Sequence, residues 1–236
     1  MKSLFVAVAF AFAFATFVIA QQRASTPQTP SNPKLPPLFF TEPWKQTGPE
    51  RDVDNDVLAN ANLELKLYGP TAKQIQIAPT TPNTRQDPPN LWTGICNGPV
   101  AATLRDKNNY VDLTGRAKIR WQTRSAGFHV VRPVLKLADG TFLVGDRADG
   151  DGSTENFAES EFSISSVRWL KLDPDNVTTL HADRSKPPEV GRWVEHPDLS
   201  KVDEVGFADL IPGSGHGWGG FVNVGRIDVF GTPVKR

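Results

Sequence analysis

The sequence is poor in the residues that most often carry chemistry. It has one cysteine, one methionine and four histidines in 236 residues. A single cysteine excludes a disulfide framework and any metal site built from several thiolates. Lysine plus arginine and aspartate plus glutamate each number 26, so the formal net charge is zero. Nucleic-acid-binding domains usually carry a clear basic excess, so this balance argues against that class.

Motifs typical of catalysis are also lacking. The histidines follow neither the H-x-H nor the H-E-x-x-H spacing of metal sites; they are His129, His181, His196 and His216. No G-x-S-x-G nucleophile elbow occurs, and Cys96 is expected to be buried as a small apolar side chain. The sequence therefore favours a protein that is not an enzyme.

The enzymatic alternative stays open. The glycine-rich segment 210–221 presents Ser214 and His216. Paired carboxylates for glycoside cleavage can be drawn from Asp203, Glu204, Asp209 and Glu195. The enzymatic alternative is therefore a glycosidase or lyase that uses this loop.

The longest apolar run stands at the N-terminus. Seventeen of residues 1–20 are apolar, Lys2 supplies a positive start, and Ala20 precedes a site where a signal peptidase could cut. This pattern predicts a signal peptide over 1–20 and a secreted or periplasmic product of bacterial type, with no membrane span after cleavage. Because the run approaches the length that spans a bilayer, a retained anchor is the alternative.

Prolines dominate the next segment, which we assign as a leader over residues 21–57. They are Pro27, Pro30, Pro33, Pro36 and Pro37. Proline fixes φ and removes an amide donor, so extended chain is expected there. Leu38-Phe39-Phe40 and Trp44 are apolar enough to pack back on the domain that we place at 58–236.

Residues 58–236 alternate between apolar and polar side chains, which is the period of a half-buried strand. The alternation is clear over 63–68 and 111–124, where Trp121 is expected in the core. Asp139-Gly140 predicts a tight hairpin turn. Further strands are expected at 75–77, 128–137, 141–144, 160–164, 166–172, 202–209 and 220–230. No window has a convincing helical period, the best being 51–60, so the sequence predicts an all-β, antiparallel β-sandwich.

The order of these segments resembles a known family. The segments are KIRW (118–121), KLADGTFLVGD (136–146), VRWLKLD (167–173), DLSKVDEVGFADL (198–210) and GRIDVFG (225–231). Together they are similar to the galactose-binding-domain-like jelly roll, particularly its carbohydrate-binding-module branch, over about residues 60–232. The resemblance implies a jelly-roll sandwich that binds carbohydrate. Segments 91–113 and 210–221 depart from the family's pattern.

Tryptophans beside glycine- and proline-rich loops are the candidates for sugar stacking, because rings on loops can face solvent. They are Trp92, Trp193 and Trp218. Arg120, Arg132 and His216 are the candidates for hydrogen bonds to the sugar. The alternative is that these indoles pack against the core at the ends of the β-sandwich and bind no ligand.

Basic residues recur on one face of the expected strands. Arg120, Arg132 and Lys136 would form a cationic strip suited to a polysaccharide with carboxylates. The alternative is an ordinary solvated face whose arginines pair with Glu161, Asp146 or Asp203.

An acidic, glycine-rich loop offers oxygen ligands for a structural Ca²⁺. Its carboxylates are Asp146, Asp149, Asp151 and Glu155. The loop lacks the spacing of an EF-hand, and a solvated hairpin is the alternative.

The sequence therefore predicts a secreted, non-catalytic module that recognises an extracellular polysaccharide or glycoconjugate. Two alternatives remain: the polysaccharide-degrading enzyme described above, and a structural or adhesive module whose sheet face meets another protein.

Overall fold

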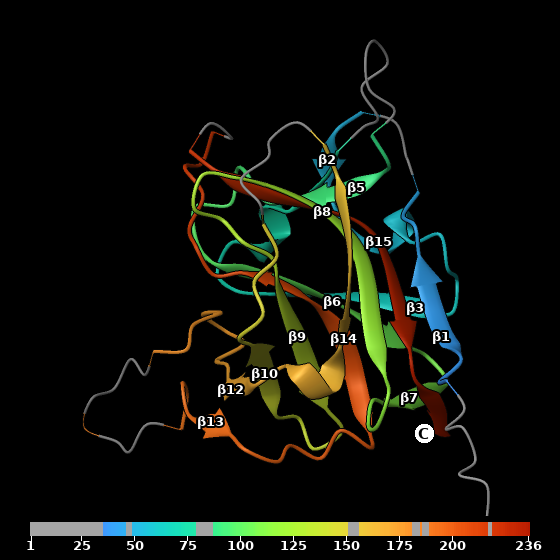
Figure 1. The fold of residues 1–236 in the computed structure, drawn as a ribbon. Helices are drawn as coiled ribbons and strands as arrows, with labels where there is room; N and C mark the ends of the chain where they lie inside the picture. Colours follow the sequence, from blue (N-terminus) through green and yellow to red (C-terminus); the bar gives the residue numbers. More distant parts are fainter. Residues whose placement is uncertain are drawn as a thin grey trace, which may run out of the picture. The chain divides into compact units, whose positions relative to one another are not determined.

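Two antiparallel sheets face each other in the computed structural model, which describes residues 35–45, 49–78, 87–150, 156–180, 185, 189–216 and 219–236. The predicted signal peptide at 1–20 lies outside the described residues. Figure 1 shows β8 and β11 of the first sheet lying in front of β9 and β14 of the second. The predicted all-β, antiparallel β-sandwich is confirmed.

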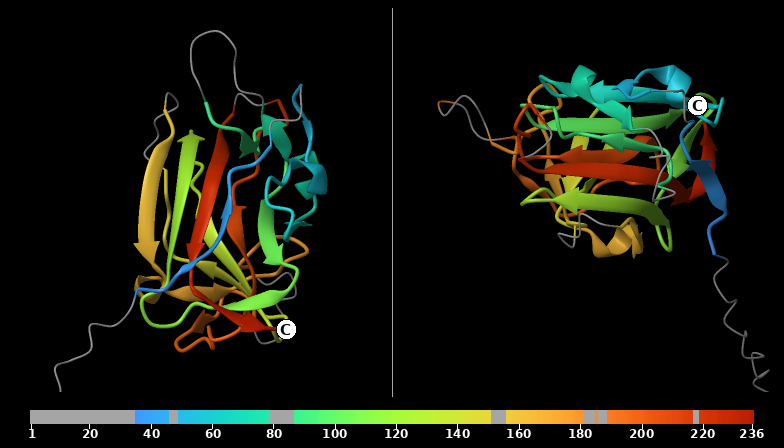
Figure 2. Two further views of the ribbon diagram at one scale, coloured as in Figure 1. Left: turned by 90° about the vertical axis from the view of Figure 1, so that its right-hand side faces the viewer. Right: turned by 90° about the horizontal axis from the view of Figure 1, so that it is seen from above.

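The first sheet, sheet A, has seven strands. In spatial order they are β11 (Ala158–Ser163), β8 (Lys118–Ala126), β15 (Phe221–Phe230), β5 (Asn90–Trp92), β4 (Gln76–Ala78) and β2 (Arg51–Asp52). The seventh strand, β1 (Leu38–Glu42), pairs with β15. Figure 2 shows β1, in blue, lying along β15, in red.

The second sheet, sheet B, has nine strands. In order they are β13 (Trp193–Val194), β12 (Trp169–Lys171), β10 (Phe142–Gly145), β9 (Arg132–Leu137), β14 (Val202–Asp209), β6 (Val100–Asp106) and β3 (Leu63–Tyr68). Two more, β7 (Asn109–Asp112) and β16 (Thr232–Lys235), join at the end of β14. Helical structure in the described residues is limited to single 3₁₀ turns, η1 (Asn55–Val57), η2 (Ala72–Gln74) and η3 (Ile164–Ser166). None of the described helices is long and apolar enough to cross a membrane.

The core lies between the inner faces of the sheets. Trp121 of β8 and Trp169 of β12 are both buried, at 1% and 2% exposure, among aliphatic side chains from both sheets. The indole of Trp121 donates from Nε1 to Asp149 Oδ2 at 2.7 Å, which satisfies its one polar atom. The expectation that Trp121 belongs to the core is confirmed.

The alternation expected for β8 is observed. Residues 119, 121 and 123 are buried, and residues 118, 120, 122 and 124 are partly exposed. The expected strand 111–124 is, however, divided into β7 and β8. The turn between them contains Gly115 at φ +66°, and Asp112 Oδ1 accepts the backbone N–H of Thr114 at 2.8 Å. This local Asx turn competes with the extended chain and ends β7.

Two other boundaries differ from expectation. The strand expected over 128–137 begins only at Arg132, because Gly127 adopts φ +66° and turns the chain before it. Segment 51–60, the best but unconvincing helical candidate, is instead the short strand β2 followed by η1, whose N-cap Asp54 accepts the N–H of Asp56 at 2.8 Å. The Asp139-Gly140 turn is confirmed: Gly140 has φ +89°, and Asp139 accepts the N–H of Thr141.

Part of the segment assigned as a leader belongs to the folded domain. The compact unit that the structure describes runs from Leu35 to Arg236, so residues 35–57 belong to it. Glu42 at the end of β1 is fully buried, and its carboxylate accepts the backbone N–H groups of Trp44, Ala59 and Asn60 at 2.7 to 3.0 Å. Trp44 packs into the core and donates from its indole to the carbonyl of Gly225 at 2.7 Å.

The cysteine is inert in this fold. Cys96 is 1% exposed, as the sequence predicted, and burial, assisted by the nearby carboxylates of Asp209 and Asp52, raises the pKa of its thiol to about 12. The side chain acts as a small apolar group in the core.

Gly206 is the position where sheet B tolerates no side chain. It lies in β14 between β6 and β9, and an added Cβ would stand 2.0 Å from the carbonyl oxygen of Ala102. We expect Gly206→Ala to destabilise the protein by roughly 1–3 kcal/mol through overpacking, measured as a lower midpoint of urea unfolding. Gly225→Ala in β15 is the matched control, because its Cβ would meet nothing closer than 3.3 Å. Equal losses in the two variants would contradict this account.

Candidate functional site

A large hollow in the described part of the molecule lies at the edge of sheet B, beside β12 and β13. It is a cleft of about 670 Å³. Its floor is apolar, from Ile164, Val167, Trp169 and Leu199, and its rim carries Arg168, Trp193, Glu195 and His196. We call it the Trp193 cleft. An apolar floor with a few polar groups at its edge is typical of ligand sites.

Trp193 is held in place although it is exposed. Its residue is 46% exposed, and β13 pairs it with Leu170 of β12. The guanidinium carbon of Arg168 lies 4.4 Å from the centre of the indole ring, a cation–π contact. Arg168 is in turn oriented by Asp146, whose carboxylate accepts its Nε and its backbone N–H, each at 2.9 Å. The indole is therefore supported by a chain of contacts that reaches back to the end of β10.

The Asp146 carboxylate stays ionised over a wide pH range. Partial burial acts to raise its pKa, but the hydrogen bonds and charge of Arg168 outweigh burial and hold the pKa below its usual value. The ion pair with Arg168 is thus present at neutral and mildly acidic pH and is lost only when the pH falls through that lowered pKa.

A second, smaller hollow lies on the outer face of sheet A and contains another of the predicted tryptophans. It measures about 300 Å³ and is lined by Glu50, Ala78, Asp87, Asn90, Trp92, Arg124, Phe221 and Asn223. We call it the Trp92 pocket. The rings of Trp92 and Phe221 meet edge to face, with centroids 6.3 Å apart at 69°. The Trp92 ring also packs on Gly94, where an added Cβ would stand 2.3 Å from it.

Polar side chains of the Trp92 pocket form a continuous chain of hydrogen bonds. Arg124 donates to Asp87 at 2.9 Å and to Asn223 Oδ1 at 3.2 Å. Asn223 donates to Asn90 Oδ1 at 2.6 Å, and Asn90 donates to the carbonyl of Pro88 at 2.9 Å. Asn90 and Asn223 are only 1% and 2% exposed, so the wall of this pocket is rigid.

The other residues proposed for sugar binding lie elsewhere. Trp218 lies outside the described residues. Arg120 is bound to Asp228 at 2.7 Å and 2.9 Å, and Arg132 donates to the backbone carbonyl of Asp146 at 3.0 Å. His216 is exposed, and its Nδ1 lies 3.2 Å from Ser214 Oγ.

The structure therefore does not bring Trp92 and Trp193 together, and it does not describe Trp218, the third tryptophan of the predicted platform. Trp92 and Trp193 line two different hollows, one on sheet A and one at the edge of sheet B, and neither hollow is lined by Arg120, Arg132 or His216. The sequence could not show this, because the separation of two loops depends on which sheet each adjoining strand enters.

Several residues of the two hollows were missed at the level of sequence. They are Asp87, Asn90, Phe221 and Asn223 in the Trp92 pocket, and Pro197 and Leu199 in the Trp193 cleft. For β15 a signal existed: Phe221 and Asn223 alternate with Val222 and Val224, which are buried. That alternation places the phenylalanine and the asparagine together on the outer face.

Two of the four proposed Ca²⁺ ligands, Asp146 and Asp149, are engaged by arginines. Asp146 is paired with Arg168, and Asp149 accepts from Trp121, from Ser160 and from Arg147, which approaches to 2.7 Å. Carboxylates already neutralised by arginine are poor calcium ligands. Asp151 and Glu155 lie outside the described residues, and within the described ones no three acidic, histidine or cysteine side chains are grouped to hold a metal.

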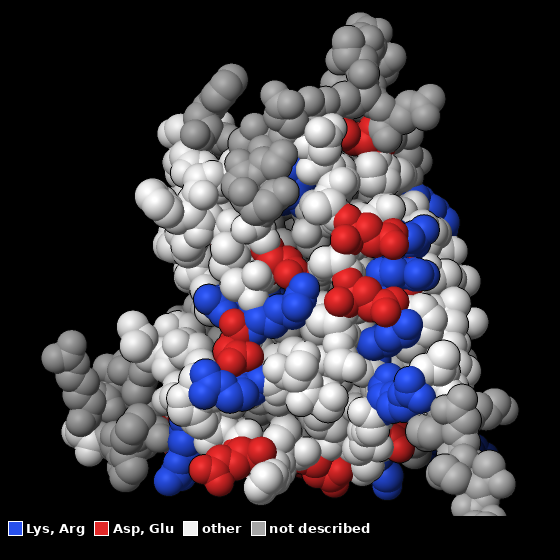
Figure 3. Space-filling model, in the orientation of Figure 1, with Lys and Arg blue, Asp and Glu red and all other residues white. Residues whose placement is uncertain are grey.

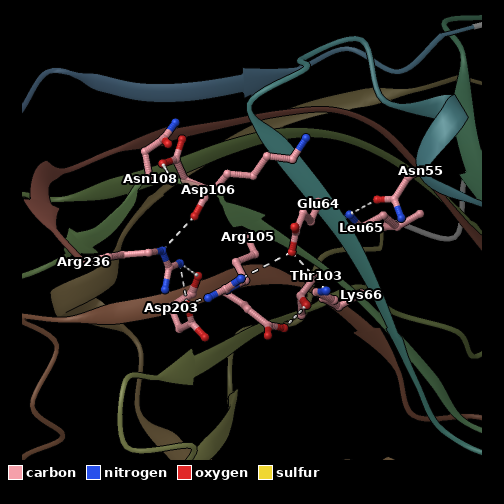
Figure 4. A network of polar contacts seen from close by, with 12 residues as sticks. Asn55, Glu64, Leu65, Lys66, Thr103, Arg105, Asp106, Asn108, Asp203 and Arg236 are labelled. Carbon is pink, nitrogen blue, oxygen red and sulfur yellow. Dashed lines mark hydrogen bonds and ion pairs between the residues drawn. The ribbon is translucent and has the colours of Figure 1, made fainter.

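The basic residues are paired rather than gathered in a strip. Figure 3 shows acidic and basic side chains interspersed on the face over β8, β11 and β15. Ion pairs there join Lys118 to Glu161, Arg120 to Asp228 and Arg226 to Glu159. Asp203 pairs with Arg105 and Arg236 on sheet B, in the network of Figure 4. These contacts match the solvated, ion-paired face that the sequence left open as the alternative.

Two more of the carboxylates named for glycoside cleavage, Glu204 and Asp209, have structural partners as well. Glu204 is 1% exposed and accepts from Tyr68, Thr103 and Lys136. Burial, together with the charge of Glu204, raises the pKa of Tyr68 well above its usual value. Asp209 is 1% exposed and lies 2.7 Å from His129 Nδ1, and it accepts the hydroxyl of Thr93 at 2.8 Å.

No protein family matches the chain, and no curated protein does. Among solved structures it is similar to the family 11 carbohydrate-binding module of a cellulosomal cellulase of Clostridium thermocellum, at 14% identity and a TM-score of 0.41, covering 77% of this chain and 94% of that one. The same module in complex with a β-1,3-1,4-mixed-linked tetrasaccharide gives 15% identity, a TM-score of 0.40, and coverage of 79% and 98%. The Emp47p carbohydrate recognition domain gives 11% identity, a TM-score of 0.37, and coverage of 82% and 95%.

These similarities are distant. At such identities and scores they carry no argument about ligand or activity, and the β-sandwich is established by the strand pairing itself. The class that the fold and the site define is therefore an antiparallel β-sandwich with an aromatic-edged cleft.

The contact between Asp146 and Arg168 makes the environment of Trp193 dependent on pH. We expect the fluorescence of Trp193, taken as the difference between the wild type and Trp193→Phe, to stay constant from pH 7 to 5. It should change only below the ordinary aspartate pKa of about 3.9, because the pKa of Asp146 is lowered. At pH 7, Asp146→Asn should already show the Trp193 emission that the wild type shows only in acid. Asp54→Asn, which removes a carboxylate paired with Arg51, is the control and should leave the emission unchanged. A wild-type transition between pH 7 and 5, with far-UV circular dichroism intact, would refute this assignment.

Proposed function

We propose that the protein is a secreted, non-catalytic module that binds an extracellular polysaccharide or glycoconjugate in the Trp193 cleft. The observation that carries the proposal is an exposed indole, 46% accessible, at the rim of a cleft of about 670 Å³. Large aromatic side chains are normally buried, so an oriented, exposed one at the edge of a hollow points to a ligand.

The chemistry of the cleft supports a sugar. The apolar C–H face of a pyranose ring stacks on an indole, and its hydroxyl groups need both donors and acceptors nearby. Arg168 supplies donors, Glu195 supplies acceptors, and His196 supplies either. Since Arg168 is already paired with Asp146, the cleft is not strongly cationic, which favours a neutral glycan over a polymer of uronates.

Binding without catalysis is supported by the state of the acidic residues. A retaining or inverting glycosidase needs two carboxyl groups that flank the scissile bond. Glu195 lines the cleft, whereas Asp203, Glu204 and Asp209 are engaged in ion pairs or buried hydrogen bonds outside it. We propose export because segment 1–20 is apolar and carries the basic residue Lys2 at its beginning.

The test is affinity gel electrophoresis of the mature chain against a panel of neutral and uronate-containing polysaccharides. We expect retardation by at least one neutral polysaccharide, and Trp193→Ala should weaken it at least roughly tenfold, as the loss of a central aromatic contact does. Phe128→Ala is the matched control, because Phe128 is 91% exposed but lines neither hollow.

Three results would overturn the proposal. Retardation that persists in Trp193→Ala would place the ligand elsewhere. New reducing ends or unsaturated products would show an enzyme, and no retardation together with a stable dimer in solution would indicate an interaction module.

A further inference from the structure

We propose that the Trp92 pocket is a second ligand site, separate from the Trp193 cleft, which takes a single neutral sugar unit or a polyol of that size. The inference stands on the geometry of this pocket and does not depend on what the cleft binds. Four observations carry it: the position of its residues in the sheet, their rigidity, their spare hydrogen-bonding capacity and their charge.

Strand register brings the pocket residues into one row on the outer face of sheet A. Asn223 of β15 stands opposite Trp92 of β5 on one side and opposite Arg124 of β8 on the other. Gln76 of β4 stands opposite Trp92 in turn. Residues directly opposite each other in antiparallel strands share a face, so four strands present a polar and aromatic row across the sheet.

The row is held in a fixed arrangement before any ligand arrives. Gly94 lies against the Trp92 ring so closely that no side chain would fit between them. Arg124 is fixed at Nε by Asn223 and at Nη1 by Asp87, and its guanidinium lies 4.8 Å from the Phe157 ring centre. A preorganised wall loses little entropy on binding, which is what a small ligand with few contacts requires.

Hydrogen-bonding capacity remains after the internal bonds are made. Each carboxamide nitrogen of Asn90 and Asn223 carries two hydrogens, and the observed bonds use one of each. Both asparagines line the pocket, so their remaining N–H groups can donate to the hydroxyl groups of a ligand there.

Charge and size define the ligand class. Arg124 is balanced by Asp87, and Glu50 adds a further carboxylate at the rim, so an anionic ligand is disfavoured. The volume of about 300 Å³ is less than half that of the Trp193 cleft, at about 670 Å³. It stands at the lower end of the range for ligand sites, roughly 300–1,000 Å³. The pocket therefore suits one ring, such as a chain end, walled by Trp92 and Phe221.

The test uses the mature chain and small glycosides as probes. Binding of the methyl glycosides of glucose, galactose, mannose and N-acetylglucosamine is measured by saturation-transfer difference NMR and titration, with methyl glucuronide as the anionic counterpart. We expect at least one neutral glycoside to bind, and its glucuronide-type analogue to bind at least roughly tenfold more weakly.

Two variants keep the site testable without disturbing its buried hydrogen bonds. Ala78→Leu fills the pocket from its half-exposed wall and should abolish glycoside binding, whereas Ala138→Leu, on an exposed turn away from both hollows, should not change it. Trp193→Ala should also leave glycoside binding unchanged, so failure of this site and failure of the Trp193 cleft are distinguishable. Absence of binding by every neutral glycoside, equal binding in Ala78→Leu, or loss in Trp193→Ala would each overturn the proposal.

Discussion

The packing of two apolar sheet faces against each other is the constraint on which the rest of this structure depends. A buried aromatic side chain removes roughly 200 Å² from water, which at about 25 cal/mol per Å² corresponds to roughly 5 kcal/mol as an upper bound. Exposed ion pairs contribute about 0–1 kcal/mol each. Trp121, Trp169 and Phe207, all nearly inaccessible, therefore outweigh the many ion pairs on the surface in holding the sheets together.

That inner packing determines what the outer faces display. Because side chains alternate along a strand, burying Val222 and Val224 of β15 compels Phe221 and Asn223 to point outward, just as burying Trp121 and Thr123 of β8 turns Arg124 outward. Core packing on the inner side of these strands therefore also fixes which side chains form the Trp92 pocket on their outer side. The Trp193 cleft has a different origin, since it forms where β13, a strand of two residues, ends sheet B and leaves an indole without a layer to cover it.

The ion pairs on the surface have a consequence for recognition. Arginines that could have formed a basic strip are bound to carboxylates across neighbouring strands, as Arg120 is to Asp228 and Arg105 to Asp203. Pairing of this kind leaves little uncompensated positive charge on these strands. In the proposed function, recognition therefore depends on shape, aromatic stacking and hydrogen bonds rather than on net charge.

Strands that alternate in polarity or adjoin a clear turn could be predicted from the sequence, and a strand without either signal could not. β3, β8, β10 and β14 showed alternation or a clear turn, whereas β6 was missed because Val100–Asp106 is buried on nearly every residue and has no period of two. β1 was assigned to a proline-rich leader, since nothing local shows that Leu38–Glu42 pairs with a strand nearly two hundred positions later. For the sites, the sequence placed Trp92 and Trp193 in one proposed platform, whereas in the structure they line two different hollows.

The sequence by itself determined the class of fold, the identity of the core indole at Trp121 and the balance of charge, because each follows from local alternation or composition. Tertiary structure alone decided which aromatic rings remain open, which arginines are neutralised and which asparagines meet across strands. Those outcomes depend on long-range register between strands such as β5, β8 and β15, where a shift of one residue would exchange the inner and outer faces.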